Sequence, residues 1–87
     1  MAVIALAWKG DQITELHNIR VLSGEREQGI GTRILGAILS HNAPGSELHI
    51  RYIDPKARQW WINRGVEIFP TETGEDGTIT KEQFDAA

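Results

Sequence analysis

A glycine-rich stretch between a strand pattern and a helix pattern is the feature that most constrains this chain. Residues 23–31 contain three glycines and a cluster of charged side chains, so neither a strand nor a helix is expected to run through them. The segment 13–22 before them reads as a strand, and the segment 30–40 after them as an amphipathic helix. Backbone N–H groups at the start of such a helix are free to bind an anion. The unit therefore favours a phosphate or pyrophosphate ligand, although two glycines can also serve only to shape a connection.

The best-delimited element is a second helix, over residues 54–65. Asp54 suits its N-cap, Pro55 its first helical position, and Gly65 its C-terminal stop. The inner face, spaced i, i+3, i+4 and i+7, consists of Ala57, Trp60, Trp61 and Arg64. Taken alone, this pattern is equally that of a well-capped helix packed on a hydrophobic core.

Four segments carry strand patterns, namely residues 2–8, 13–22, 47–53 and 66–69. Residues 71–80 read as a turn or loose hairpin, and Thr80 with Gln83 predicts a capped final helical turn. The order is strand, strand, helix, strand, helix, strand. It predicts an α+β fold with a mixed, mostly antiparallel sheet and two helices.

Strict alternation predicts which side chains share a face of the sheet. In segment 13–22, one face is expected to carry Ile13, Glu15, His17, Ile19 and Val21, provided that no bulge intervenes. In segment 47–53, Tyr52 is expected to pack with the apolar Leu48 and Ile50, while His49 lies on the strand surface.

Length and composition limit the class of protein. With 87 residues and no cysteine, we expect one domain spanning residues 1–87 and neither a disulfide framework nor a thiolate metal site. The net charge of −3 argues against non-specific nucleic-acid binding. The apolar start is too short for a signal peptide or a membrane span, so a cytoplasmic location is the default. Basic residues gather between Arg20 and Arg64 and acidic ones in the C-terminal extension 70–87, which points to an anionic ligand at the middle of the chain.

Three other ligand motifs fit poorly. A P-loop needs Lys-Ser or Lys-Thr where Gly31 is followed by Thr32-Arg33. A dinucleotide fingerprint needs a third glycine in G-x-G-x-x-G spacing. Residues 75–80 resemble half of a calcium-binding EF-hand loop, but an acidic turn accounts for them better because the required bidentate glutamate is Gln83. No metal site is predicted.

Two motifs together resemble the GNAT superfamily of N-acetyltransferases. The family's acetyl-CoA motif, Gln/Arg-x-x-Gly-x-Gly/Ala, matches Arg26, Gly29 and Gly31. Its second motif, Asn/Asp-x-x-Ala-x-x-aromatic-aromatic-x-x-x-Gly, matches with every spacing intact. The matching residues are Asp54, Ala57, Trp60, Trp61 and Gly65. The resemblance covers about residues 2–69 and corresponds to a miniature member without the N-terminal half that binds the acceptor.

The resemblance implies acetyl-CoA as cofactor and assigns residues to it. The pyrophosphate would lie on the loop motif, whose members are Arg26, Gln28, Gly29, Ile30, Gly31 and Thr32. The pantetheine arm would pair with the backbone of Ile19 and Val21 on a splayed strand. Asp54, Ala57 and Trp61 would line the other side of its channel.

The resemblance to the GNAT superfamily is less complete for the general acid and the general base. Many GNAT members have a tyrosine at the position of Trp61, which acts as general acid, and tryptophan cannot fill that role. Glu15 lies eleven residues before Arg26, as does the general base of the histone-acetyltransferase branch of the family. His17, two residues further on, is the substitute candidate. Glu15 can also be read as one exposed strand residue among several.

The expected function is therefore transfer of an acetyl group from acetyl-CoA to an amine of a small molecule or protein. The alternative is a catalytically inactive domain that binds CoA or a protein and acts as a regulator or inhibitor. An effector that acetylates a host protein also fits the small size. The unpaired edge of segment 2–8 favours a homodimer.

Overall fold

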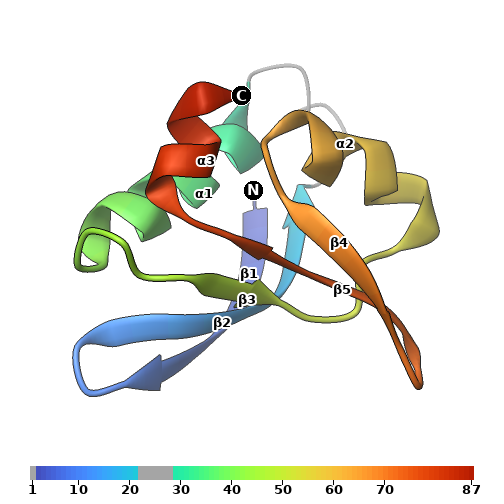
Figure 1. The fold of residues 1–87 in the computed structure, drawn as a ribbon, viewed down its shortest axis with the longest axis horizontal. Coiled ribbons are helices and arrows are strands. Elements are labelled where there is room, and N and C mark those ends of the chain that lie inside the picture. Colours follow the sequence, from blue (N-terminus) through green and yellow to red (C-terminus); the bar gives the residue numbers. More distant parts are fainter. Residues whose placement is uncertain (1, 22–28) are drawn as a thin grey trace.

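The structure, a computed structural model, describes residues 2–21 and 29–87. These residues form an α+β fold with a five-stranded mixed sheet and three α-helices (Figure 1). In chain order the elements are β1 (Ala2–Lys9), β2 (Gln12–Val21), α1 (Ile30–His41), β3 (Leu48–Ile50), the 3-10 turn η2 (Pro55–Ala57), α2 (Arg58–Asn63), β4 (Glu67–Thr71), β5 (Gly74–Ile79) and α3 (Lys81–Ala86). The α+β class and the mixed sheet expected from the sequence are confirmed.

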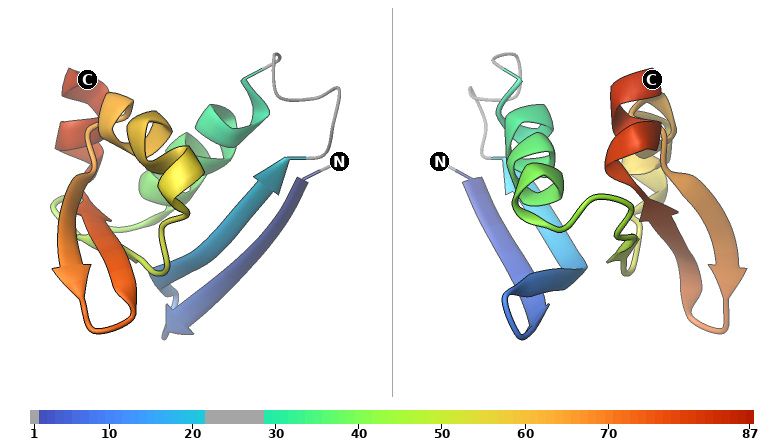
Figure 2. Two further views of the ribbon diagram at one scale, coloured as in Figure 1. Left: turned by 90° about the vertical axis from the view of Figure 1, so that its right-hand side faces the viewer. Right: turned by 60° about the vertical axis from the view of Figure 1, so that its left-hand side comes forward.

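The strands lie in the order β1-β2-β3-β5-β4. The pairs β1–β2, β3–β5 and β4–β5 are antiparallel, and β2–β3 is parallel. The helices lie on one side of this sheet, and the two hairpins β1–β2 and β4–β5 diverge from each other around them (Figure 2). In the part of the chain that the structure describes, no helix is both long and apolar enough to cross a bilayer.

The hydrophobic core lies between the helices and the sheet face that they cover. Its fully buried side chains come from three strands and α1 because each strand turns alternate residues toward the helices. They are Leu16, Leu35, Leu48, Ile50 and Ile79. Gly77 on β5 faces the same core, where an added Cβ would collide with the Val66 side chain and approach Ile53 Cδ1 to 3.0 Å. The absence of a side chain at Gly77 therefore lets Val66, which follows α2, and Ile53 pack directly against β5.

Two irregularities in the β1–β2 register change the expected alternation of β2. Ala7 pairs with Glu15 and Trp8 with Ile13, so Thr14 is an extra residue, and a second shift lies between Ala5 and Leu6. The condition that no bulge intervenes is therefore not met. Ile13 is buried with Leu16 on the helix-covered face, whereas Glu15 and His17 remain on one face and contact each other at 2.9 Å.

The expected strand over 47–53 is shorter, and the placement of Tyr52 was wrong. Tyr52 has a positive φ of 57°, a left-handed conformation that is unusual for a bulky residue. The alternation therefore breaks after Arg51. As a result Tyr52 is exposed, and Ile53 takes the buried position instead.

The C-terminal region contains more structure than the sequence predicted. Residues 74–79, expected to be part of a turn or loose hairpin, form β5, which inserts between β3 and β4. The predicted cap is present, because Thr80 and Gln83 form a reciprocal capping box at the start of α3. The sheet therefore has five strands and the fold three α-helices, where four and two were expected.

Candidate functional site

The start of α1 has the backbone expected of the glycine loop. Gly29 is the N-cap residue, with φ 69° and ψ 23°, and among the described residues no side chain caps the helix. A Cβ at Gly29 would meet nothing within 4 Å, so the glycine serves backbone conformation there and not packing. Gly31 is buried within the first turn. Arg26 and Gln28 lie outside the described residues, as do residues 22–25 and 27.

Arg64 connects α2 to the first turn of α1. Its Nε donates to Thr32 Oγ1 at 3.1 Å and its Nη1 to the Trp60 carbonyl at 3.3 Å. The guanidinium lies 4.2 Å from the centre of the Trp60 ring. A positive charge is therefore held beside the helix N-terminus, where it adds to the attraction for an anion.

Strands β2 and β3 are parallel neighbours only briefly. They pair at Glu15 with His49 and at Leu16 with Ile50, and a last bond runs from Arg51 N to Leu16 O at 2.9 Å. After Tyr52, the chain bonds to β5 instead, through Ile53 N and Glu75 O at 2.8 Å. Within the described residues, positions 17–21 of β2 therefore pair only with β1. Ile19 and Val21, the predicted pantetheine-binding residues, belong to this separated part and pair with Ile4 and Ala2.

The second motif forms the helix that its sequence predicts. The Asp54 side chain accepts a hydrogen bond from Lys56 N at 2.9 Å, Pro55 begins the 3-10 turn, and Gly65 ends α2 with φ 99°. Ala57 is half-buried, and Trp61 belongs to the hydrophobic core with 6% of its surface exposed. Asp54 and Ala57 thus shape the N-terminus of this helical segment, and Trp61 anchors it to the core.

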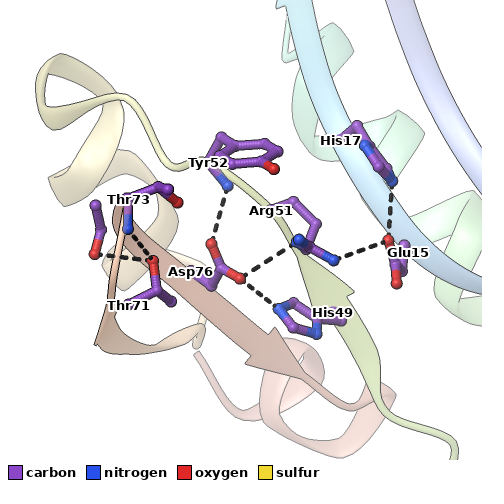
Figure 3. Close-up of polar contacts among 9 residues, drawn as sticks. Glu15, His17, His49, Arg51, Tyr52, Thr71, Thr73 and Asp76 are labelled. Atoms are coloured by element: carbon purple, nitrogen blue, oxygen red, sulfur yellow. Dashed lines mark hydrogen bonds and ion pairs between the residues drawn. The ribbon is translucent and has the colours of Figure 1, made fainter.

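A cluster of polar side chains lies on the sheet face opposite the helices (Figure 3). This open-face cluster consists of Glu15, His17, His49, Arg51 and Asp76. Glu15 Oε1 contacts His17 Nε2 at 2.9 Å and Arg51 Nη1 at 3.5 Å. The two candidate bases from the sequence are therefore brought together, next to the point where β2 and β3 separate.

Asp76 is the buried centre of the open-face cluster, with 5% of its surface exposed. Its Oδ1 accepts from Tyr52 N at 3.1 Å, and its Oδ2 lies 2.7 Å from His49 Nε2. Arg51 Nε lies 3.4 Å from the same oxygen, close enough for an ion pair but without hydrogen-bond geometry. Two hydrogen-bonding partners and one cationic group thus surround one carboxylate.

Opposing influences act on the pKa of Asp76. Burial, the largest, raises it, but the Tyr52 N–H, the hydrogen bond from His49 and the charges of His49 and Arg51 lower it. Together the lowering influences prevail, so the pKa lies below its ordinary value of 3.8. Asp76 is therefore ionised at neutral pH.

His49, Arg51 and Asp76 were not predicted as site residues. His49 was interpreted as a strand surface, Arg51 as solvated, and Asp76 as part of an acidic turn. A usable signal was present, since alternation in 47–53 puts His49 and Arg51 on one face, away from Leu48 and Ile50. The missing information was the position of β5, which brings Asp76 to them from 27 residues away.

Comparisons with known proteins give no assignment: no protein-family model, curated protein or solved structure matches the chain. Among the residues that the structure describes, no group of three His, Asp or Glu side chains is arranged to hold a metal ion.

Proposed function

We propose that this chain is an N-acetyltransferase that moves an acetyl group from acetyl-CoA to an amine of a small molecule or protein. The observation that carries the proposal is the separation of the parallel strands β2 and β3 after two residue pairs. A glycine-started helix follows β2, and a helical segment capped by Asp54 follows β3. These three features are those that the resemblance to the GNAT superfamily requires, and they occur in its order along the chain.

The separated part of β2 suits an extended ligand. On the side away from β1, residues 17–21 have no strand partner among the described residues, and strand backbone groups form hydrogen bonds where a partner is supplied. The pantetheine arm has amides that can take that place. In this proposal the thioester carbonyl lies where β3 leaves β2, and a backbone N–H of β2 at that point polarises it.

The anionic end of acetyl-CoA would lie at the start of α1. Gly29 has no side chain that could cap that end, and Arg64 supplies a fixed positive charge beside Thr32. Helix N-termini of this kind bind phosphate through their free N–H groups. The proposal retains the expected cytoplasmic location, and a homodimer through β1, which is an edge strand of the sheet.

Calorimetric titration with acetyl-CoA tests the binding half of the proposal. Wild-type protein should bind saturably, and Gly29→Glu should weaken binding at least about tenfold, because the new carboxylate would repel the phosphates and the new Cβ would disfavour the left-handed backbone. Gly10→Glu is the matched control. Gly10 has φ 64° and, like Gly29, open space around its added Cβ, but it lies in the β1–β2 turn. Absence of binding by folded wild-type protein would refute the proposal.

The second candidate function is binding of CoA or a protein partner without turnover. It is favoured by Trp61, which stands where many GNAT members have their general acid and is buried in the core here. Release of CoA thiol in the presence of a panel of primary amines separates the two functions. A transferase releases thiol with at least one amine, whereas a binding domain releases none.

A further inference from the structure

We infer that His49, held in place by Asp76, takes the proton from the acceptor amine. This inference rests on the proposed function and moves the role of base from Glu15 to a pair of residues that the sequence did not single out. It is based on the burial of Asp76, the orientation of the His49 ring and the position of His49 in the sheet.

Asp76 fixes which ring nitrogen of His49 is free. The ionised carboxylate carries no proton, so in the 2.7 Å contact His49 Nε2 is the donor and Asp76 Oδ2 the acceptor. The other nitrogen, Nδ1, then keeps its lone pair when the ring is neutral. The Tyr52 N–H holds the second carboxylate oxygen at 3.1 Å, so the carboxylate is anchored at both oxygens. A histidine oriented in this way by a buried aspartate is a common form of general base.

His49 lies where the thioester of the proposed reaction would lie. It pairs with Glu15 across β2 and β3, one residue before their last pair, and adjacent strands are about 4.8 Å apart. Its side chain is 36% exposed and packs against Phe69 with ring centres 5.8 Å apart. The ring is thus accessible on the open face and supported on one side.

The pair formed by His17 and Glu15 is less well anchored. The Glu15 side chain is 31% exposed against 7% for Asp76, and its Oε1 serves both His17 and Arg51. An exposed carboxylate orients a histidine weakly because solvent competes for both groups. Glu15 is suited instead to attract the positively charged amine toward His49.

In the proposed reaction, the acceptor amine loses two protons, and each has a named acceptor. The protonated amine loses one proton to His49 Nδ1, and its nitrogen then attacks the carbonyl carbon of the acetyl thioester. The new C–N bond forms as the C–S bond breaks. The second proton of the amine goes to the departing CoA thiolate, which becomes the thiol, and His49 returns the first proton to water. An imidazole is suited to this exchange because one ring nitrogen can accept a proton while the other donates a hydrogen bond.

Two matched variants test the assignment by turnover with acetyl-CoA and an active amine. His49→Gln should lower kcat about 100-fold or more, since a positioned general base contributes about 10²–10⁴-fold. His17→Gln, the same change one strand away on the same face, and Glu15→Gln should each lower kcat less than about tenfold. A His49→Gln protein that keeps its turnover, or a larger loss of kcat in Glu15→Gln, would overturn the inference.

Asp76→Asn tests the positioning role through the ring itself. The side-chain amide of asparagine can donate to His49 Nε2, which would move the ring proton to Nδ1 and remove the free lone pair. Long-range proton–nitrogen NMR should show a proton on Nε2 in the wild type and on Nδ1 in the variant, with kcat falling in parallel. A change of tautomer without loss of turnover would contradict the inference, as would a wild-type ring protonated on Nδ1.

Calorimetric titration of the same proteins with acetyl-CoA distinguishes failure of the proposed function from failure of the role assigned to His49. Absence of binding by the wild type refutes the proposed function, and this inference with it. Wild-type binding and turnover that persist in His49→Gln refute the inference alone.

Discussion

Two buried polar side chains, Asn42 and Asp76, are satisfied in different ways. Asn42, 7% exposed, accepts from Ile13 N and donates to Ile13 O, both at 2.8 Å. Both partners are backbone groups of one residue of β2. Asp76, 5% exposed, has one backbone donor, Tyr52 N, and two side-chain partners, His49 and Arg51, each about one third exposed.

The difference separates a structural contact from a candidate site. The Asn42 amide satisfies the backbone N–H and C=O of Ile13 and so ties the end of α1 to β2. The Asp76 carboxylate instead connects the interior to the side chains of His49 and Arg51, which reach solvent. Burial of the Asp76 carboxylate is unfavourable, and its contact with His49 fixes the orientation of the His49 ring. A purely structural role would not require an oriented histidine.

The largest loss of stability is expected from removing the contact between the Asn42 side chain and the backbone of Ile13, which we call the closed contact. Asn42→Ala would leave the N–H and C=O of Ile13 buried without partners, at a cost of about 2–6 kcal/mol because each of the two unsatisfied groups costs about 1–3. Urea denaturation followed by circular dichroism measures the loss. Asn63→Ala is the control, since Asn63 is exposed and bonds only to Gln59 among the described residues. Equal effects of the two changes would remove the structural role assigned to Asn42.

A smaller loss of stability is expected at the open-face cluster. Asp76→Asn keeps an oxygen for Tyr52 N but replaces charge-assisted bonds to His49 and Arg51 by neutral ones, which should cost about 1–2 kcal/mol. Asp85→Asn removes an exposed carboxylate paired with Lys81 and should leave the denaturation midpoint nearly unchanged. If Asp76→Asn were as harmless as the control, Asp76 would not be the anchored centre of the cluster.

The stability difference between wild type and Asp76→Asn should also depend on pH. The folded-state pKa of Asp76 is lowered below 3.8, with His49 and Arg51 as the cationic groups facing it. Ionised Asp76 therefore stabilises the folded state above pH 3.8, and this contribution is lost as pH falls through the lowered value. The two denaturation curves should converge in that acidic window. A difference that stays constant down to the acid-unfolding limit would contradict the lowered pKa.

The elements predicted most reliably from the sequence are those with local signals. Asp54, Pro55 and Gly65 mark the second helical segment through backbone chemistry that acts within a few residues, and Thr80 with Gln83 marks α3 in the same way. The apolar period of α1 correctly predicted an inward face, on which Leu35, Ile38 and Leu39 are buried.

Non-local pairing explains what was missed. Strand β5 contains Gly74, Gly77 and the acidic pair Glu75–Asp76, which are residues that strands disfavour, and its place between β3 and β4 depends on the whole sheet. The reversal at Tyr52 follows from a left-handed backbone that local patterns disfavour. Because His49, Arg51 and Asp76 come together only through β5, the open-face cluster could not be predicted from alternation within single strands.

The smallest loss of stability is expected at Glu15, the partly exposed carboxylate of the open-face cluster. Glu15→Gln keeps an oxygen for His17 and Arg51 and removes one negative charge from a position about one third exposed. Exposed pairs of this kind contribute about 0–1 kcal/mol, so the free energy of unfolding should fall by less than in Asp76→Asn. The same urea titration measures it. A loss as large as that of Asp76→Asn would mean that the five side chains form one structural unit, and the contrast between a closed contact at Asn42 and an open one at Asp76 would no longer hold.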